Sequence, residues 1–538
     1  MAPGGMVSSP HYLASEAGVA VLRRGGTAID GAIAAAAVLS VVYPHMCSIG
    51  GDNFWLIWDA RAGALKALNG SGRSGAGCTI ESYKRQGVDG AIPYRGFLAA
   101  NTVPGALDGW ATAYEYSRWR MGSPLLWSDL LQDAIRYAED GYPVSPSQEF
   151  WTRVNLDGAA GPQRNLQRFE GFRRTYLTPD GRPHRAGAIM RQPDLSRTLK
   201  TIAYGGGRFF YEGDIARRVT AYLKAGGGVL TESDLAEHRS DWVEPLTVPY
   251  RDTVAVGFPP NTQGIAALSI LNILNHLDVG SFGEGTADHV HAAVEATKLA
   301  FADRDRWVSD PAFLKAPTER LLAPSYGAAR ARQIAMDRAG HYAPGDVGGD
   351  TVFLAAMDAG RNAVALIQSI YHDFGSAVVA GDTGVLLQNR GAFFSLDRRH
   401  PNRLEPRKRT FHTLIPAMLL RCGRPYLVYG TMGGEGQPQT QAAVVTRVVD
   451  FGMDVQQAIE APRWLYGRTW GEDTGALQIE GRFPATVAED LARRGHQVRR
   501  LEDWTDTMGH AQAILIDPVT GLLWGGADPR GDGAAIGF

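Results

Sequence analysis

Thr351 carries the group with the clearest potential for chemistry in this chain of 538 residues. It follows a glycine-rich stretch and opens an apolar run, residues 352–357. If the bond between Asp350 and Thr351 were cut, Thr351 would hold both a hydroxyl nucleophile and a free α-amine to activate it. An α-amine has a pKa of about 8, so a modest downward shift lets it act as a base at neutral pH. The sequence therefore predicts a threonine nucleophile that a chain cleavage creates.

A glycine-rich turn, residues 430–436, supplies a second candidate group. It follows an apolar run, residues 425–429, and precedes a helical run, residues 439–448. The glycines Gly433 and Gly434 leave backbone N–H groups unshielded near a helix N-terminus, which suits an oxyanion hole. A plain strand–helix turn explains the same residues equally well, and the two interpretations stay open at this point.

The elements that must position these groups fall into helix-rich and strand-rich stretches. Apolar periodicity predicts helices over residues 13–24 and 28–43, and a mostly helical character over 105–225 and 264–339. The glycine-rich segment 339–350 predicts an accessible surface loop before the nucleophile. Strands are predicted at residues 54–58, 352–357, 363–371, 379–388, 414–421, 425–429, 511–516 and 522–526.

Composition narrows the class of protein. A formal net charge of −2 and a pI near 6.7 argue against a nucleic-acid partner or a polybasic membrane contact. The longest apolar run, residues 32–43, is shorter than the roughly 18–20 residues that a spanning helix needs. No signal peptide is visible at the start of the sequence, so we expect a cytoplasmic protein without a membrane partner.

The residues that most often bind metals give no pattern for a metal site. Cys47, Cys78 and Cys422 are too scattered for a disulfide framework or a zinc site, and we expect them to be buried as small apolar side chains. His289 and His291 lie two apart on a predicted helix, so their side chains face different ways. We therefore expect no metal and no other cofactor.

Taken together, the motifs resemble the γ-glutamyltranspeptidase family of N-terminal-nucleophile hydrolases. The resemblance covers nearly the whole chain, and many weak matches in the right order make it specific. The matching motifs are residues 25–36, 49–52, 103–105, 300–304, the hairpin that opens at Thr351, 374–381, 431–434 and 527–530.

The resemblance implies a fold, a cleavage and a set of roles. The fold is an α+β four-layer αββα sandwich, and self-cleavage between Asp350 and Thr351 gives a large subunit, 1–350, and a small subunit, 351–538. The two subunits come from one precursor and together form one αββα unit; the resemblance leaves open whether such αβ units pair as a dimer. Thr351 is the nucleophile, Ser369 supports it with a second hydroxyl, and Gly433 and Gly434 supply the oxyanion-hole N–H groups.

Departures from the family pattern fall in the substrate pocket. The arginine that normally holds the α-carboxylate of a γ-glutamyl group is replaced by Ser71, although Arg73 lies nearby. A glutamyl ammonium would lose its carboxylate partner, and an unpaired buried charge is costly. The other replaced positions are Val352, Phe353, Tyr371, Arg390, Phe393, His412 and Thr413.

The altered residues resemble those of the oxamate amidohydrolase branch of the family. That resemblance implies hydrolysis of a small carboxylate-bearing amide, with Arg390 and His412 holding the carboxylate. Because most arginines are exposed, Arg390 could instead be a solvated surface cation. The predicted substrate-binding residues are Tyr371, Arg390, His412, Thr413 and Arg73.

The sequence thus predicts a self-processing N-terminal threonine amidohydrolase that acts on a small-molecule amide. Three alternatives stay open. The first is a γ-glutamyltransferase or glutathione hydrolase, the second is an acylase of glutaryl-type amides, and the third is a non-catalytic scaffold that never cleaves.

Overall fold

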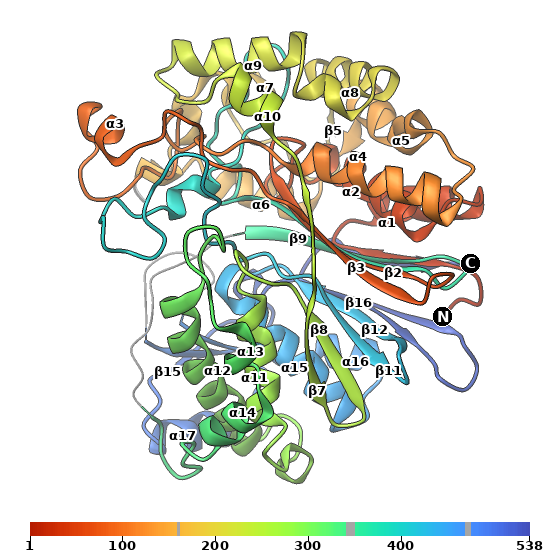
Figure 1. Ribbon diagram of the computed structural model, residues 1–538, viewed down its shortest axis with the longest axis vertical. Coiled ribbons are helices and arrows are strands. Elements are labelled where there is room, and N and C mark those ends of the chain that lie inside the picture. The colour runs from red at the N-terminus through yellow and green to blue at the C-terminus, as the bar shows by residue number, and fades with distance from the viewer. Residues whose placement is uncertain (159–161, 341–349, 468–474) are drawn as a thin grey trace.

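Two stacked antiparallel sheets form the centre of the structure, and helices cover the outer face of each (Figure 1). This computed structural model describes residues 1–158, 162–340, 350–467 and 475–538. The arrangement is the expected four-layer αββα sandwich, so the predicted fold class is confirmed.

One sheet has seven strands in the order β18-β1-β9-β10-β2-β3-β6, and the other has six in the order β17-β16-β12-β11-β8-β7. In the first sheet the bounds are Ala534–Gly537, Met6–Ser9, Asp350–Met357, Ala363–Tyr371, Asp52–Asp59, Ala64–Gly70 and Asp241–Val243. In the second they are Leu523–Ala527, Ala511–Ile516, Arg424–Thr431, Ala417–Arg421, Thr253–Gly257 and Leu246–Tyr250.

Each sheet has its own helical cover and its own core. The helices over the seven-stranded sheet include α1 (Tyr12–Arg23), α2 (Ala28–Val42), α4 (Ala106–Tyr116), α5 (Trp127–Asp140) and α8 (Pro193–Gly205). Those over the six-stranded sheet include α11 (Gly264–Leu274), α12 (Ala287–Trp307), α14 (Pro324–Ala331), α15 (Gln437–Val449) and α16 (Val455–Glu460). The smaller elements are α3 (Ile80–Arg85), α6 (Pro146–Val154), α7 (Glu170–Tyr176), α9 (Asp214–Ala225), α10 (Glu232–Glu237), α13 (Thr318–Leu321), α17 (Ala485–Arg493), β4 (Tyr142–Pro143), β5 (Ile189–Met190), β13 (Trp464–Tyr466), β14 (Leu477–Ile479) and β15 (Val498–Arg500).

Helix α2 shows why small side chains matter beside the sheet. All of its residues are buried, and its alanines let the helix approach β9 and β10 closely. The helix begins in a capping box, in which the Thr27 backbone N–H donates to Asp30 Oδ2 over 2.7 Å. An alanine-rich run too short to span a membrane is therefore a central core helix.

Side chains alternate along β9, which decides where Thr351 points. Val352 and Leu354 pack with the helices above the sheet, whereas Phe353 and Ala355 pack between the two sheets. Because successive strand residues face opposite sides, Thr351 shares the inter-sheet side with Phe353. The nucleophile candidate therefore lies at one end of the layer between the sheets.

Several predicted helices and strands are confirmed, and the prediction of one strand is wrong. The predicted helices and the 352–371 hairpin are present, while residues 379–388 form no regular strand. That run makes an isolated bridge between Val379 and Leu386, around a turn at Gly381 and Gly384. Its apolar side chains are buried against the helices above the seven-stranded sheet, which explains a strand-like pattern without a strand.

Other expectations have mixed outcomes. Cys47 and Cys78 are buried, but the expectation for Cys422 is wrong because it is exposed in the turn between β11 and β12. Strand β11 begins at Ala417 rather than 414, since Pro416 has no N–H to donate to a ladder. The predicted loop 339–350 lies largely outside the described residues.

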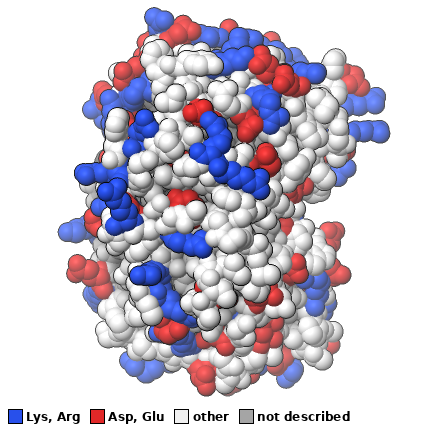
Figure 2. Space-filling view, turned by 90° about the vertical axis from the view of Figure 1, so that its right-hand side faces the viewer, with Lys and Arg blue, Asp and Glu red and all other residues white. Residues whose placement is uncertain are grey.

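The surface carries charges of both signs. Lys and Arg side chains are interspersed with Asp and Glu over the face shown in Figure 2, in keeping with the formal net charge of −2. Across the described ranges, we find no helix with the length and apolar character that crossing a membrane requires.

The inter-sheet core gives a stability prediction. Phe353 is 1% exposed, and its ring lies against the backbone of Gly430 on the facing sheet. Phe353→Ala should lower the free energy of unfolding by about 3–5 kcal/mol, because a cavity replaces the ring. Chemical denaturation of the purified protein measures this, with Val519→Ala, at a site 91% exposed, as the control that should change little. Equal stability of the two variants would contradict the layer described above.

Candidate active site

Three adjacent strands bring polar side chains to one end of the inter-sheet layer. Thr351 lies on β9, Ser369 on β10 and Asp52 on β2, and all three are fully buried. Ser369 is the register partner of Asp52. Each shares the face of its strand that packs against the second sheet.

The Thr351 hydroxyl is held from the facing layer. Gln437 Nε2 donates to Thr351 Oγ1 over 3.4 Å. Gln437 is the first residue of α15, and its Oε1 accepts from the Ile415 N–H over 3.2 Å, so its side chain is fixed at both ends. Asp350, the residue before Thr351, pairs with Tyr371 across the β9–β10 ladder.

An irregularity in β10 turns the chain beside Thr351. The register shifts between Gln368 and Tyr371, and Tyr371 has φ +83, in the left-handed region. The Tyr371 N–H donates to Ser369 Oγ over 2.7 Å, which stabilises the turn. Non-glycine residues with positive φ gather at functional sites more often than elsewhere, because the surroundings must hold them there.

Arg390 is buried, so the alternative of a solvated surface cation is wrong. Its exposed fraction is 0%, and it donates to Thr413 Oγ1 over 3.0 Å and to Ser369 Oγ over 3.2 Å. Its guanidinium also lies 4.4 Å from the centre of the Tyr371 ring, a cation–π contact. The structure therefore brings Ser369, Tyr371, Arg390 and Thr413 into one cluster.

Asp52 is the anionic partner in this region, and sequence reasoning gave it no role. Its Oδ1 accepts from the backbone N–H groups of Gly72 (3.0 Å) and Gly105 (3.1 Å) and from Gln388 Nε2 (3.0 Å). Burial raises the pKa of Asp52 to about 6, while these hydrogen bonds and the charge of Arg390 act in the opposite direction. At neutral pH the group is a carboxylate.

His412 points its ring at the same carboxylate. Its Nε2 lies 3.3 Å from Asp52 Oδ2, and its Nδ1 accepts from the Leu414 N–H over 3.5 Å. Burial, together with the charges of Arg390 and Arg409, holds the pKa of His412 well below its usual range. His412 is therefore a neutral donor to Asp52.

The glycine turn adopts a conformation that suits glycine. Gly433 has φ +125 and Gly434 φ +51, and the chain then passes through a short 3-10 turn, Gly434–Gly436, into α15. A side chain at either position would strain the backbone. The two residues thus sit at the positive end of a helix, as the anion-binding interpretation requires.

A buried charge pair fixes the turn from the helical layer. Gln263 Nε2 donates to the Gly434 carbonyl over 2.8 Å and to the Thr413 carbonyl over 2.9 Å. Arg304 in turn donates to Gln263 Oε1 over 3.0 Å and to Glu435 Oε2 over 2.6 Å. One network therefore links the glycine turn to the segment that carries His412 and Thr413.

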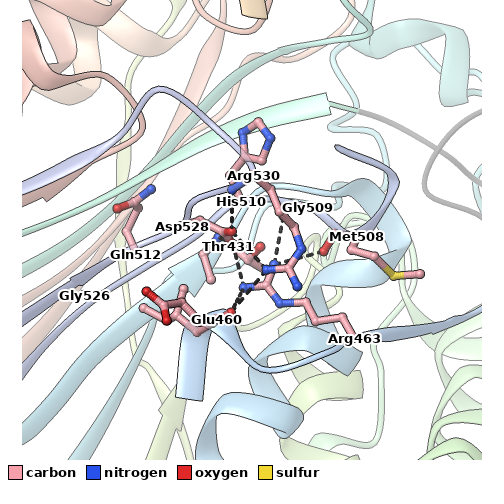
Figure 3. Close-up of polar contacts among 12 residues, drawn as sticks. Thr431, Glu460, Arg463, Met508, Gly509, His510, Gln512, Gly526, Asp528 and Arg530 are labelled. Carbon is pink, nitrogen blue, oxygen red and sulfur yellow. Dashed lines mark hydrogen bonds and ion pairs between the residues drawn. The ribbon is translucent and has the colours of Figure 1, made fainter. Parts of the chain in front are cut away.

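A second network holds the strand that leads into the turn (Figure 3). Met432 donates its N–H to the His510 carbonyl over 3.0 Å, and Arg463 donates to the Gly509 carbonyl over 2.8 Å. Asp528 pairs with Arg463 at 2.6 Å and accepts from the Ala511 N–H at 2.7 Å. The motif at 527–530 therefore acts at a distance, by fixing the end of β16 beside β12.

Arg73 stands apart from this cluster. Its guanidinium pairs with Asp241 at 3.0 Å and is 38% exposed, and it lines a hollow of about 80 Å³ with Arg407 and His238. Ser71, at the position of the family's arginine, is buried and donates to Asn69 Oδ1 over 2.6 Å. The structure thus gathers the predicted residues except Arg73.

Sequence reasoning missed the residues that orient the cluster. Asp52, Gln263, Arg304 and Gln437 come from separate parts of the chain, and only the fold brings them to Thr351, Arg390 and the glycine turn. The signals in the sequence were the motif 49–52, in which a carboxylate directly follows two glycines, and the motif 300–304, which ends at Arg304. A charged residue at the first position of a buried strand is a reason to look for a partner.

The raised pKa of Asp52 gives a pH prediction. Its folded pKa of about 6 lies above an unfolded value of about 4, so its contribution to stability is fully present below about pH 4 and is lost as the pH rises through 6. The melting temperature of the wild type, relative to Asp52→Asn, should therefore fall between about pH 4 and pH 7. Parallel melting curves across that range would contradict this assignment.

Comparison with known proteins agrees with the geometry. The family model for γ-glutamyltranspeptidase matches residues 14–538. The chain is 47% identical to the glutathione hydrolase-like YwrD proenzyme of Bacillus subtilis (strain 168), covering 99% of this chain and 98% of that protein. It is 44% identical to the oxamate amidohydrolase proenzyme of Klebsiella pneumoniae, again covering 99% and 98%.

Among solved structures, the cephalosporin acylase from Bacillus halodurans superposes with a TM-score of 0.91 at 38% identity. The match covers 100% of this chain and 96% of that one. These similarities extend over both sheets and both helical layers. The chain belongs to the γ-glutamyltranspeptidase family and is a hydrolase of that family.

Proposed function

We propose that the chain is a self-processing N-terminal threonine amidohydrolase that acts on a small carboxylate-bearing amide such as oxamate. The observation that carries this proposal is the place of Thr351: buried on a central strand, with Gln437 on its hydroxyl. The names of both relatives include the word proenzyme, which supports a precursor that is cut.

Processing requires one nucleophilic step and one hydrolysis. Thr351 Oγ attacks the Asp350 carbonyl carbon, the peptide C–N bond breaks as the hydroxyl proton passes to the released nitrogen, and an ester joins Asp350 to Thr351 Oγ. Water then hydrolyses the ester and leaves an Asp350 carboxylate and a free Thr351 α-amine. The products are a large subunit, 1–350, and a small subunit, 351–538.

Turnover repeats the chemistry on a substrate. The α-amine takes the hydroxyl proton of Thr351 as Oγ attacks the amide carbonyl, and the N–H groups of Gly433 and Gly434 stabilise the oxyanion. The amide nitrogen leaves as ammonia with the transferred proton, and water hydrolyses the acyl-threonine. Ser369 supports the nucleophile with a second hydroxyl from the neighbouring strand.

The buried guanidinium of Arg390 favours a substrate with a carboxylate. Arg390 and Thr413 bind that carboxylate, and the Tyr371 ring forms one wall of the pocket. His412 orients Asp52 rather than contacting the substrate, since its Nε2–H is directed at Asp52. Arg73 reaches a substrate only after its ion pair with Asp241 opens.

The leading alternative is a γ-glutamyltransferase or glutathione hydrolase, and the name of the relative at 47% identity favours it. Acylase action is a weaker alternative, supported by the superposition on the cephalosporin acylase. Against the γ-glutamyl alternative, a γ-glutamyl ammonium needs an acidic partner, and the family positions for it hold Arg390 and Phe393. A scaffold that never cleaves is the remaining alternative.

Removal of the Thr351 hydroxyl tests the processing step. Thr351→Ala should give a single chain of 58.1 kDa on a denaturing gel and release no ammonia from oxamate, because neither ester can form. Thr351→Ser, which keeps a hydroxyl, should still yield two chains, as should the exposed control Thr520→Ala. Two chains or activity from Thr351→Ala would refute the proposal.

Replacement of Arg390 tests the substrate class separately. Arg390→Lys keeps the charge but loses the planar fork, so KM for oxamate should rise about ten-fold or more while the chain still cleaves. Arg399→Lys, at an arginine side chain 91% exposed, is the matched control with unchanged KM. Steady-state ammonia release measures both variants.

A wild-type enzyme that releases chromophore from a γ-glutamyl anilide, but no ammonia from oxamate, would reverse the order of the two leading functions. Chain cleavage is read from the same preparations on a gel. The ammonia and chromophore assays therefore test the substrate, whereas the gel tests the nucleophile.

A further inference from the structure

A cluster of potential metal ligands lies away from the residues described above, on the helical layer under the six-stranded sheet. His291 and Glu295 lie four residues apart on α12, so they share one face of that helix. His496 joins them from the turn between α17 and β15. The three side chains are buried, and one ligand atom from each lies within 4.8 Å of the others.

The two histidines of the sequence pair have different surroundings. His289 Nε2 lies 3.2 Å from Thr446 Oγ1, and its ring packs edge-on against Phe451 and Trp464. His291 faces His496 instead. The partner of His291 is thus more than 200 residues away in sequence, and the spacing of His289 and His291 could not indicate it.

The hydrogen bonds of His291 fix its tautomer. Its Nε2 lies 2.9 Å from the Ala335 carbonyl, which only accepts, so Nε2 carries the proton and donates. Nδ1 then presents a lone pair towards His496 Nε2, 2.8 Å away. A backbone carbonyl behind a histidine is the common means of orienting a metal ligand.

Both imidazoles are in the neutral form that binds metals. Burial lowers the pKa of His291 and lowers that of His496 to about 3, with Lys298 adding to the shift of His496. Without a metal, His496 Nε2–H donates to His291. If the proton of His496 moves to Nδ1, the lone pairs of the two rings face each other across 2.8 Å, so the rings must separate and turn for both to bind one ion.

Glu295 supplies the third ligand atom, a carboxylate oxygen, and is held by groups that a cation would displace. Its Oε1 lies 4.0 Å from His496 Nε2 and accepts from Lys298 Nζ over 2.7 Å. Its Oε2 accepts from the Gly340 N–H over 2.9 Å, and Lys298 also donates to the Gly340 carbonyl over 3.0 Å. The ammonium of Lys298 therefore occupies the position of a competing cation.

We propose that His291, Glu295 and His496 form a binding site for a divalent transition-metal cation, with Zn²⁺ the best match to two imidazoles and one carboxylate. Three protein ligands leave a fourth position for water. Binding requires the ligand atoms to move from their present separations to those of a tetrahedral shell, and it requires Glu295 to exchange Lys298 for the metal. The bound metal would join α12 to the turn at His496.

Calorimetric titration of the EDTA-dialysed full-length protein with Zn²⁺ tests the site, with metal content measured by mass spectrometry. We expect one Zn²⁺ per chain, and His291→Gln or His496→Gln should weaken binding about ten-fold or more. His276→Ala, which removes an exposed histidine elsewhere, is the matched control and should bind Zn²⁺ like the wild type.

Lys298→Met separates a metal site from a purely structural cluster. Loss of the competing ammonium should tighten Zn²⁺ binding about ten-fold or more, and Zn²⁺ should raise the melting temperature of this variant more than that of the wild type. A structural cluster alone predicts lower stability that Zn²⁺ does not restore.

Co²⁺ absorption of the wild type gives a readout that needs no variant to fold. An intense visible spectrum of low-coordinate Co²⁺, abolished by one equivalent of Zn²⁺, supports the proposal. A wild type that takes up neither ion would overturn it, and so would Zn²⁺ binding of equal strength in the wild type, His291→Gln and His496→Gln.

Discussion

The two-residue alternation of β9, β10 and β2 is the constraint on which the rest of this structure depends. It directs Phe353 and its neighbours into the layer between the sheets, and the same alternation directs Thr351, Ser369 and Asp52 to the end of that layer. A register slip of one residue would turn the Thr351 and Ser369 hydroxyls towards the helical layer. It would also turn Phe353 and its apolar neighbours out of the core between the sheets. Core packing and placement of the site are therefore set by one pattern.

Burial of charge is the second consequence of placing a polar cluster there. Arg390 and Asp52 are both fully buried, and an unpaired charge there would be strongly destabilising. Arg390 has the Thr413 and Ser369 hydroxyls and the Tyr371 ring, and Asp52 has two backbone N–H groups, Gln388 and neutral His412. These contacts fix the orientation of each member.

Local patterns predicted the parts of the site that are local. The Thr351 hairpin and the glycine turn each lie within a short run, so strand periodicity and glycine content were sufficient to find them. The Asp52–His412 contact joins residues 360 positions apart, and no spacing rule reports such a contact. Residues 379–388 were assigned wrongly because buried apolar alternation has the same appearance in a strand and in an extended segment packed on helices.

The oxyanion-hole role proposed for the glycine turn explains why so much charge is buried around Thr351. Backbone N–H groups stabilise an oxyanion only if they already point at it, because reorganisation during the reaction would cancel the gain. Glycine gives the turn its conformation but leaves it flexible, so rigidity has to come from elsewhere. Arg304 and Glu435 hold the turn from the helical layer, and Arg463 and Asp528 hold the strand that enters it. The distant residues of the chain thus supply the rigidity that the glycines lack.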